Sequence, residues 1–246
     1  MTLRSAGRDA VNAIARLFGL RVVHRDWGPR GAMASLNLVR AGGFSPALVF
    51  DIGASNGQWT QECLRIFPQA RYVLADPLDT NRQALALLAH ENPRISIWEG
   101  AVGSVAGSLE VHCHGDQSSA LPSREFDGPI RTVSMQTVDA LYALQRSPAP
   151  VFLKADVQGY ELEVLRGANQ CLENTELILL ELSFRRLYDN CALAHEIIAY
   201  LGERNFRIYD ICSYLQRPLD RELVQSDVLF VHESSAMFRN HSWGVP

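Results

Sequence analysis

The chain contains the segment Val49-Phe50-Asp51-Ile52-Gly53-Ala54-Ser55-Asn56-Gly57, in which an apolar run leads directly into a glycine turn. The turn has the form D-x-G-x-x-x-G, which differs from the G-x-G-x-x-G of dinucleotide-binding enzymes. Gly53 allows the backbone to turn sharply, and Gly57 allows close packing where a helix begins. The segment therefore predicts a strand, a ligand-binding turn and a helix, as at the start of an open α/β domain.

The groups around this turn suit a ligand that carries both a positive and a negative charge. Asp51 ends the strand, so we expect it to repel a diphosphate and to attract an ammonium group. The backbone amides of the turn are expected to meet a carboxylate. The methionine part of S-adenosylmethionine (AdoMet) carries both groups. The residues predicted to bind it here are Asp51, Gly53, Ala54, Ser55, Asn56 and Gly57.

Strand-like and helix-like patterns alternate after the turn. We expect strands at 47–52, 71–76, 94–99, 151–156, 176–182, 206–211 and 227–232, and helices at 58–67, 79–91, 160–166 and 192–202. This alternation predicts an α/β fold, with a mostly parallel sheet of seven strands and helices on both faces. The last two strands are expected to form an antiparallel pair at one edge.

Two regions depart from the alternation. Residues 108–114 and 130–136 alternate like half-exposed strands around a polar stretch, which predicts an inserted β-hairpin or flap. Residues 1–43 predict an N-terminal helical extension, so the main domain is expected at 44–246. An amphipathic stripe over residues 3–18 favours a helix packed on the domain or on a second subunit, as in a homo-oligomer, over one lying on a membrane.

Further cofactor contacts are expected at the ends of the second and third strands. Asp76 follows the second strand at the spacing at which a carboxylate accepts hydrogen bonds from ribose hydroxyls, and Pro77 follows it. A turn or a helix N-cap is the alternative function of Asp76. After the third strand, the small residues around Ala101 and Val102 could lie against an adenine ring, or could form a tight turn.

A second motif, Lys154-Ala155-Asp156-Val157-Gln158-Gly159-Tyr160-Glu161, continues as Leu162-Glu163-Val164-Leu165-Arg166-Gly167-Ala168. It resembles the signature of the FkbM methyltransferases, K-x-D-V-E-G-x-E-x-x-V-L-x-G-A, and the resemblance extends over about residues 49–231. The resemblance implies a Rossmann-like class I methyltransferase that uses AdoMet to methylate hydroxyls of sugars, glycolipids, polysaccharides or polyketides. The chain departs from the pattern at Gln158, where Glu is usual, and at Asp76, where Glu is common.

The second motif also supplies the candidate catalytic residues. Asp156 ends a central strand, so it could orient an acceptor hydroxyl and accept its proton, although a helix N-cap is the alternative. Lys154 shares its strand face and could bind a substrate oxygen or pair with Asp156. The other two candidate catalytic residues are Glu161, at the start of the next helix, and Glu181, in an apolar strand. Asp156 and Glu181 could instead hold Mg²⁺, but two acids without a third ligand favour a metal-free site.

Composition excludes several classes of protein. A net charge of −4, without a run of Lys and Arg, disfavours a nucleic-acid partner. Five scattered cysteines without C-x-x-C spacing indicate reduced thiols and a cytoplasmic protein, and no apolar stretch reaches the length of a membrane span. The alternatives are an AdoMet-binding scaffold without activity and an NAD-dependent dehydrogenase, of which the second would need the G-x-G-x-x-G turn.

Overall fold

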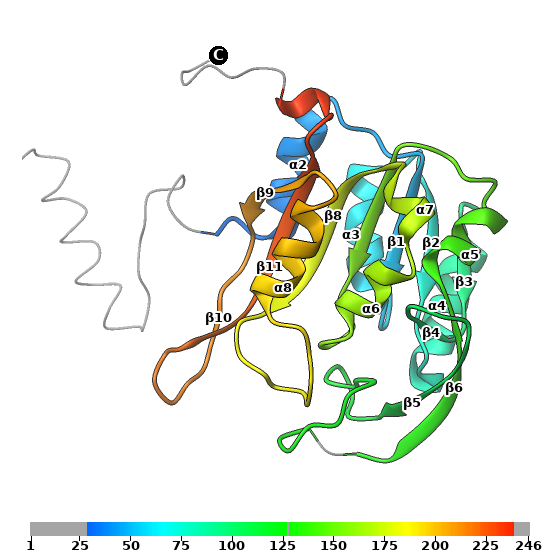
Figure 1. Cartoon of the computed structure of the whole chain (residues 1–246). Helices are drawn as coiled ribbons and strands as arrows, with labels where there is room; N and C mark the ends of the chain where they lie inside the picture. Colours follow the sequence, from blue (N-terminus) through cyan, green and yellow to red (C-terminus); the bar gives the residue numbers. More distant parts are fainter. Residues whose placement is uncertain (1–28, 127, 239–246) are drawn as a thin grey trace, which may run out of the picture.

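The computed structural model describes residues 29–126 and 128–238, which form a large mixed sheet covered by helices (Figure 1). The neighbouring strands run in the order β3 (Ile95–Trp98), β2 (Arg71–Ala75), β1 (Leu48–Ile52), β7 (Val151–Ala155), β8 (Thr175–Ser183) and β11 (Leu223–His232). Within this order, β3, β2, β1, β7 and β8 run parallel to one another, and β11 is antiparallel to β8. Both β9 (Phe206–Ile211) and the short β10 (Leu215–Gln216) pair antiparallel with β11. The predicted parallel sheet with an antiparallel edge is confirmed, and β10 adds an eighth strand.

The helices divide between the two faces of the sheet. Helices α2 (Ala32–Ala41), α3 (Gln58–Ile66) and α4 (Asp79–Glu91) share one core, and α5 (Val138–Leu144), α6 (Glu161–Arg166), α7 (Asn169–Leu172) and α8 (Ala194–Gly202) share the other. Successive residues of β1 alternate between these cores: Val49 packs with the first group and Phe50 with the second. Apolar side chains on both faces explain why the central strands are continuous hydrophobic runs.

The register of three parallel strands brings the two sequence motifs together. Ile52 at the end of β1 is paired with Ala75 of β2 on one side and Ala155 of β7 on the other. The next residues along the three segments are Gly53, Asp76 and Asp156, so all three lie at the same edge of the sheet. Ligands of open α/β sheets bind at this carboxyl edge.

The inserted hairpin forms a separate small sheet beside this edge. Strand β5 (Gly107–His112) pairs antiparallel with β6 (Ile130–Gln136), as the alternation predicts, and β4 (Ala101–Val102) pairs parallel with β6. The segment between β5 and β6 folds back on β5, because the backbone groups of His112 and Ser119 exchange two hydrogen bonds. The flap is therefore anchored at its base.

Some elements were not expected from the sequence. The unpredicted helix α5 follows Thr137, whose side chain accepts a hydrogen bond from the amide of Ala140, a capping signal that the sequence does contain. Helix α7 and the 3₁₀ turn η1 (Ala236–Phe238) are shorter than the patterns that identify helices. Helix α2 lies within the predicted helical extension, whereas the amphipathic stripe at 3–18 lies outside the described residues.

Two other expectations concern the domain boundary and the membrane. Leu36 and Val39 of α2 are fully buried in the same core as α3, and the boundary at residue 43 stays a prediction. Within residues 29–126 and 128–238, none of the helices has the length and apolar character needed to cross a bilayer.

Gly53 gives a direct test of how the two motifs meet. Its φ is +76°, and an added Cβ would lie 1.9 Å from the carbonyl oxygen of Asp156. We expect Gly53→Ala to lower the free energy of unfolding by more than about 2 kcal/mol, because a left-handed conformation and a backbone clash add together. The midpoint of urea unfolding measures this loss.

Gly202→Ala is the matched control for this substitution. Gly202 ends α8, and nothing lies within 4 Å of an added Cβ there. We expect this variant to unfold at or above the urea concentration of the wild type, since Ala has the higher helix propensity. Equal midpoints for Gly53→Ala and the wild type would contradict the proposed close contact.

Candidate functional site

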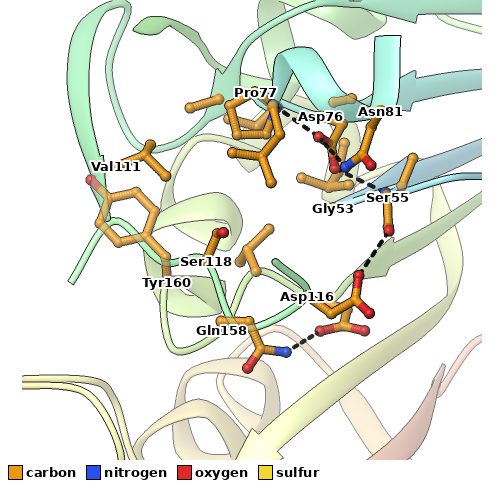
Figure 2. Close-up of a pocket in the computed structure, with 18 of the residues that line it drawn as sticks. Gly53, Ser55, Asp76, Pro77, Asn81, Val111, Asp116, Ser118, Gln158 and Tyr160 are labelled. Carbon is orange, nitrogen blue, oxygen red and sulfur yellow. Dashed lines mark hydrogen bonds between the residues drawn. The ribbon is translucent and has the colours of Figure 1, made fainter. Parts of the chain in front are cut away.

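A cavity of about 460 Å³ lies at the carboxyl edge of the sheet, a volume in the range of small-molecule sites. Its walls come from the glycine turn, the ends of β2 and β7, the segment around β4, and the flap. The residues predicted from the sequence as site residues that line it are Gly53, Ala54, Ser55, Asn56, Asp76, Pro77, Ala101, Val102 and Asp156. Gly57 was also predicted to bind the cofactor but does not line the cavity. Figure 2 shows Asp76, Asn81 and Ser55 toward one end of this cavity and Tyr160 and Val111 toward the other.

The backbone amides of the glycine turn are mostly bonded within the protein. Gly53 and Ala54 both donate to the carbonyl of Ala75, and Gly57 donates to that of Ala54. The amide of Ser55 donates to Asp76 at 2.9 Å. The expectation that a ligand carboxylate meets a row of free amides is therefore corrected, because these four amides tie the turn to the end of β2 and to itself.

Asp76 joins the turn to the following helix while facing the cavity. Its carboxylate accepts hydrogen bonds from the amide of Ser55, the amide of Leu78 and the side chain of Asn81, each at 2.9 Å. An ionised carboxylate has about four acceptor positions, so about one remains for a ligand hydroxyl. Burial raises the pKa of Asp76, whereas these three donors favour its ionised form. It does not cap α4, which begins after Leu78.

Asp51 has a different position from the one the sequence led us to expect. It is fully buried beneath the cavity and is absent from its lining. One carboxylate oxygen accepts from the Thr60 hydroxyl at 2.6 Å, and the other lies 2.9 Å from the ammonium nitrogen of Lys154. The prediction that Asp51 receives the ammonium group of a ligand is corrected, because a lysine of the neighbouring strand already occupies it.

Lys154 is held between the two motifs. Its ammonium group also donates to the carbonyl of Gly53 at 2.9 Å, and part of its side chain lines the cavity. Burial disfavours the charged form, but Asp51 and then Asp156 outweigh burial and raise the pKa of Lys154. The predicted pair with Asp156 is thus replaced by a buried pair with Asp51. Lys154 keeps its charge and acts as a fixed donor at the floor of the site.

Asp156 is the candidate catalytic carboxylate that lines the cavity. It follows β7 directly, is half-buried, and accepts a hydrogen bond from the side-chain amide of Gln158 at 2.9 Å. Helix α6 begins after Tyr160 and has no side-chain cap, so the N-cap alternative for Asp156 is wrong. Its carboxylate is therefore available to a molecule in the cavity.

Glu161 and Glu181 lie behind the cavity wall. Glu161 is 1 % exposed and accepts from the amides of Val157 and Gly159. Burial raises its pKa to about 7, and burial followed by the charge of Asp156 raises the pKa of Glu181 to about 9. Neither residue lines the cavity. The expectation that they act directly on an acceptor is corrected: Glu161 holds the loop that carries Asp156, and Glu181 lies below that loop.

The flap supplies further site residues outside the two motifs. Ser55 donates its hydroxyl to Asp116 at 3.2 Å, and Ser119, which is 2 % exposed, donates to the backbone oxygen of Gln158 at 2.7 Å. Asp116, Ser118 and Ser119 all line the cavity. Sequence patterns predicted the flap but could not show that it folds over both motifs.

The far end of the cavity is apolar. Ala101 and Val102 are buried there, and Leu109, Val111 and Tyr160 complete the lining. A Cβ at Gly103 would lie 3.0 Å from the Tyr160 ring, so this glycine leaves the space in which the ring lies. A flat aromatic group could fit here between the small residues and Tyr160.

Two further groups bear on what the site could bind. Trp59 packs its ring edge against Phe152, as expected for a core residue, but its buried indole N–H has no hydrogen-bond partner among the described residues. Other atoms of Trp59 line the cavity. Over the same part of the chain, no group of three or more His, Cys, Asp or Glu has the arrangement of a metal site.

Comparison with solved structures shows the methyltransferase fold. The FkbM methyltransferase of Methylobacillus flagellatus KT matches with a TM-score of 0.51 and 18 % identity, over 78 % of this chain but 46 % of its own. This chain thus spans about half the length of that protein.

Two other solved structures match at lower similarity. Magnesium protoporphyrin IX methyltransferase from Synechocystis PCC 6803, solved with bound SAM, matches with a TM-score of 0.45 and 14 % identity over 94 % of this chain and 98 % of its own. The precorrin-6y C5,15-methyltransferase of Geobacter metallireducens GS-15 matches with a TM-score of 0.43 and 10 % identity over 81 % of this chain and 86 % of its own. The match to the Methylobacillus flagellatus KT structure, together with the strand order of the sheet, confirms the predicted Rossmann-like class I methyltransferase fold.

Family comparison agrees with the motifs. No curated protein matches the chain. The model of the methyltransferase FkbM domain matches residues 51–208, which begin in the glycine turn and include the second motif. Since this match covers more than half of the sequence, the chain belongs to the FkbM family of methyltransferases.

Proposed function

We propose that the protein transfers the methyl group of AdoMet to a hydroxyl oxygen of a small neutral acceptor, such as a sugar, a glycolipid or a polyketide. The observation that carries the proposal is that one cavity joins the cofactor motif, represented by Asp76, to a carboxylate that lines the same cavity, that of Asp156. A cofactor site and a proton acceptor are the two components that O-methylation needs.

The cavity fits AdoMet in two places. Asp76 retains an acceptor position for a ribose hydroxyl, and the apolar end between Ala101 and Tyr160 accommodates a flat ring. When bound, AdoMet supplies a methyl group on a positively charged sulfur, which leaves as a neutral thioether with the electron pair of the broken bond.

The chain's own residues then have separate tasks. Asp156 orients the acceptor hydroxyl and takes its proton as the oxygen forms its bond to the methyl carbon. Lys154, fixed by Asp51 and the carbonyl of Gly53, keeps the ends of β1 and β7 together. The flap, through Asp116 and Ser119, closes over the site and contributes to the exclusion of water.

The charges of the lining support a neutral acceptor. Glu62, Asp76, Asp116 and Asp156 line the cavity, and the ammonium group of Lys154 is already paired with Asp51. An excess of carboxylates attracts a sulfonium cation and repels phosphate groups. Together with the net charge of −4, this argues for a small-molecule acceptor rather than nucleic acid. The five free cysteines fit a protein that works in the cytoplasm.

Ligand binding gives the first test of this function. We expect AdoMet and its demethylated product to stabilise the purified protein, by about 2.7 kcal/mol at 100 times the dissociation constant. NAD at the same concentration is the control and should have no effect, because the turn lacks the dinucleotide pattern. Thermal unfolding measures both, and equal stabilisation by NAD would overturn the cofactor assignment.

Asp76→Ala tests the cofactor side of the cavity. We expect the affinity for AdoMet to fall by about 1–3 kcal/mol, because a hydroxyl loses its acceptor. Asp76→Asn is the matched variant, because its side-chain oxygen can still accept the hydrogen bond from the amide of Ser55. Comparison of the two variants therefore separates ribose binding from support of the turn. Isothermal calorimetry measures both affinities. If Asp76→Ala binds AdoMet like the wild type, Asp76 is only a turn residue.

Asp156→Asn tests the chemistry. We expect turnover to fall at least about a hundredfold with nearly unchanged affinity for AdoMet, because Asn keeps the shape but cannot accept the proton. The measurement is transfer of labelled methyl to pools of sugar, glycolipid and polyketide acceptors. A fully active Asn variant would contradict base catalysis. AdoMet binding by the wild type without transfer to any acceptor would instead favour the scaffold alternative.

A further inference from the structure

Gln158 lines the cavity and contacts two acids, Asp156 and Glu181. It is 8 % exposed, and its backbone has a φ of 54°. The side-chain nitrogen lies 2.9 Å from a carboxylate oxygen of Asp156 and 3.0 Å from one of Glu181. Figure 2 shows this amide beside the carboxylate that it contacts. One side chain therefore connects the end of β7 to β8.

The orientation of the amide follows from the groups on both of its sides. The side-chain oxygen of Gln158 lies 2.9 Å from the Tyr188 hydroxyl, which also lies 3.0 Å and 3.2 Å from the side-chain and backbone oxygens of Gln117. The backbone oxygen of Gln158 accepts a hydrogen bond from Ser119 at 2.7 Å. A glutamine amide has two N–H donors and one carbonyl acceptor. With the oxygen on the side of Tyr188, one N–H is left for each acid, and a flipped amide would place its oxygen against two carboxyl groups.

The surrounding charges leave the acids in need of such donors. Glu161 from α6 and Asp227 from β11 face the same group and raise the pKa of Glu181 further, after burial and Asp156. Lys154 opposes this effect, but its ammonium group is shared between Asp51 and the carbonyl of Gly53. On the side of β11, the side-chain amide of Gln225 donates to Glu181 at 2.6 Å. Glu181 thus accepts hydrogen bonds from two neutral side-chain amides, those of Gln158 and Gln225. Of these two, the amide of Gln158 also contacts Asp156.

We propose that Gln158 is a positioning residue, whose side-chain amide holds Asp156 and Glu181 together in the place that a divalent cation would otherwise take. The inference deepens the proposed function and rests on it, because it concerns how Asp156 is aimed at the acceptor. Both hydrogen bonds leave the second oxygen of Asp156 for the cavity. An amide carries no charge, so the carboxylate remains a base while its geometry is fixed.

Gln158→Glu tests this arrangement, since it keeps the shape and replaces two donors by a third carboxyl group. The neighbouring carboxylates raise the pKa of the introduced carboxyl group in the folded protein above its value in the unfolded chain. The folded state of the variant therefore loses stability relative to the unfolded state as the pH rises between these two pKa values. We expect the urea midpoint of the variant to fall further below that of the wild type between about pH 5 and pH 8. Millimolar Mn²⁺ should reduce this loss, because carboxylates are hard oxygen ligands.

Gln61→Glu is the control, because Gln61 is exposed on α3 and away from the acids. It should show neither the pH-dependent loss nor a response to Mn²⁺. If the difference between Gln158→Glu and the wild type does not change with pH, or Mn²⁺ does not reduce it, the proposal is overturned.

A measurement on the wild type covers the case in which Gln158→Glu fails to fold. The side-chain amide of Gln158 should exchange slowly in ¹⁵N NMR spectra and shift in Asp156→Asn, whereas rapid exchange would overturn the proposal. The two hypotheses fail separately. If Asp156→Asn is fully active while the side-chain amide of Gln158 exchanges slowly in the wild type, base catalysis is rejected and the positioning role is not. If Asp156→Asn is inactive while this amide exchanges rapidly in the wild type, only the positioning role is rejected.

Discussion

The close contact between Gly53 and the carbonyl of Asp156 is the constraint on which the site depends. It exists because β1 and β7 are adjacent parallel strands that end in register, and because Gly53 has no side chain to separate them. Two motifs far apart in the sequence therefore share one wall of a cavity. Lys154 strengthens the same junction, since its ammonium group bridges Asp51 at the end of β1 and the carbonyl of Gly53. A larger residue at position 53 would disturb cofactor binding and the candidate base together.

The buried polar groups below the cavity are compensated by different means. Asp51 pairs with the ammonium group of Lys154 and accepts a hydrogen bond from the Thr60 hydroxyl. Glu161 accepts hydrogen bonds from two backbone amides, and Glu181 accepts them from two side-chain amides. The pKa of Glu181 is also raised, to about 9. Removing one partner from such a group costs more than the hydrogen bond itself contributes, because the remaining polar group stays buried. Each acid therefore depends on particular neighbours, and Asp156 alone of the predicted catalytic acids both belongs to this network and lines the cavity.

The flap gives the cavity its remaining wall and part of its charge. Its polar residues contact both motifs, since Asp116 bonds to Ser55 and Ser119 bonds to the backbone of Gln158. A ligand that binds under the flap is thus in contact with the cofactor turn and with the loop of the second motif at once. Such coupling suits a transfer reaction, in which the two substrates must be aligned before the proton and the methyl group move.

The sequence by itself determined the alternating α/β order, the antiparallel edge, the hairpin and the places of Asp76 and Asp156 at strand ends, because these depend on local periodicity. It could not determine the partners of Asp51, Lys154, Gln158 and Glu181, because those follow from strand register and from which helix covers which face. An acid at a strand end has the same sequence signature whether it faces a ligand or a buried lysine. Only the tertiary structure, by filling the space around each carboxylate, decided that Asp156 faces the cavity and Asp51 does not.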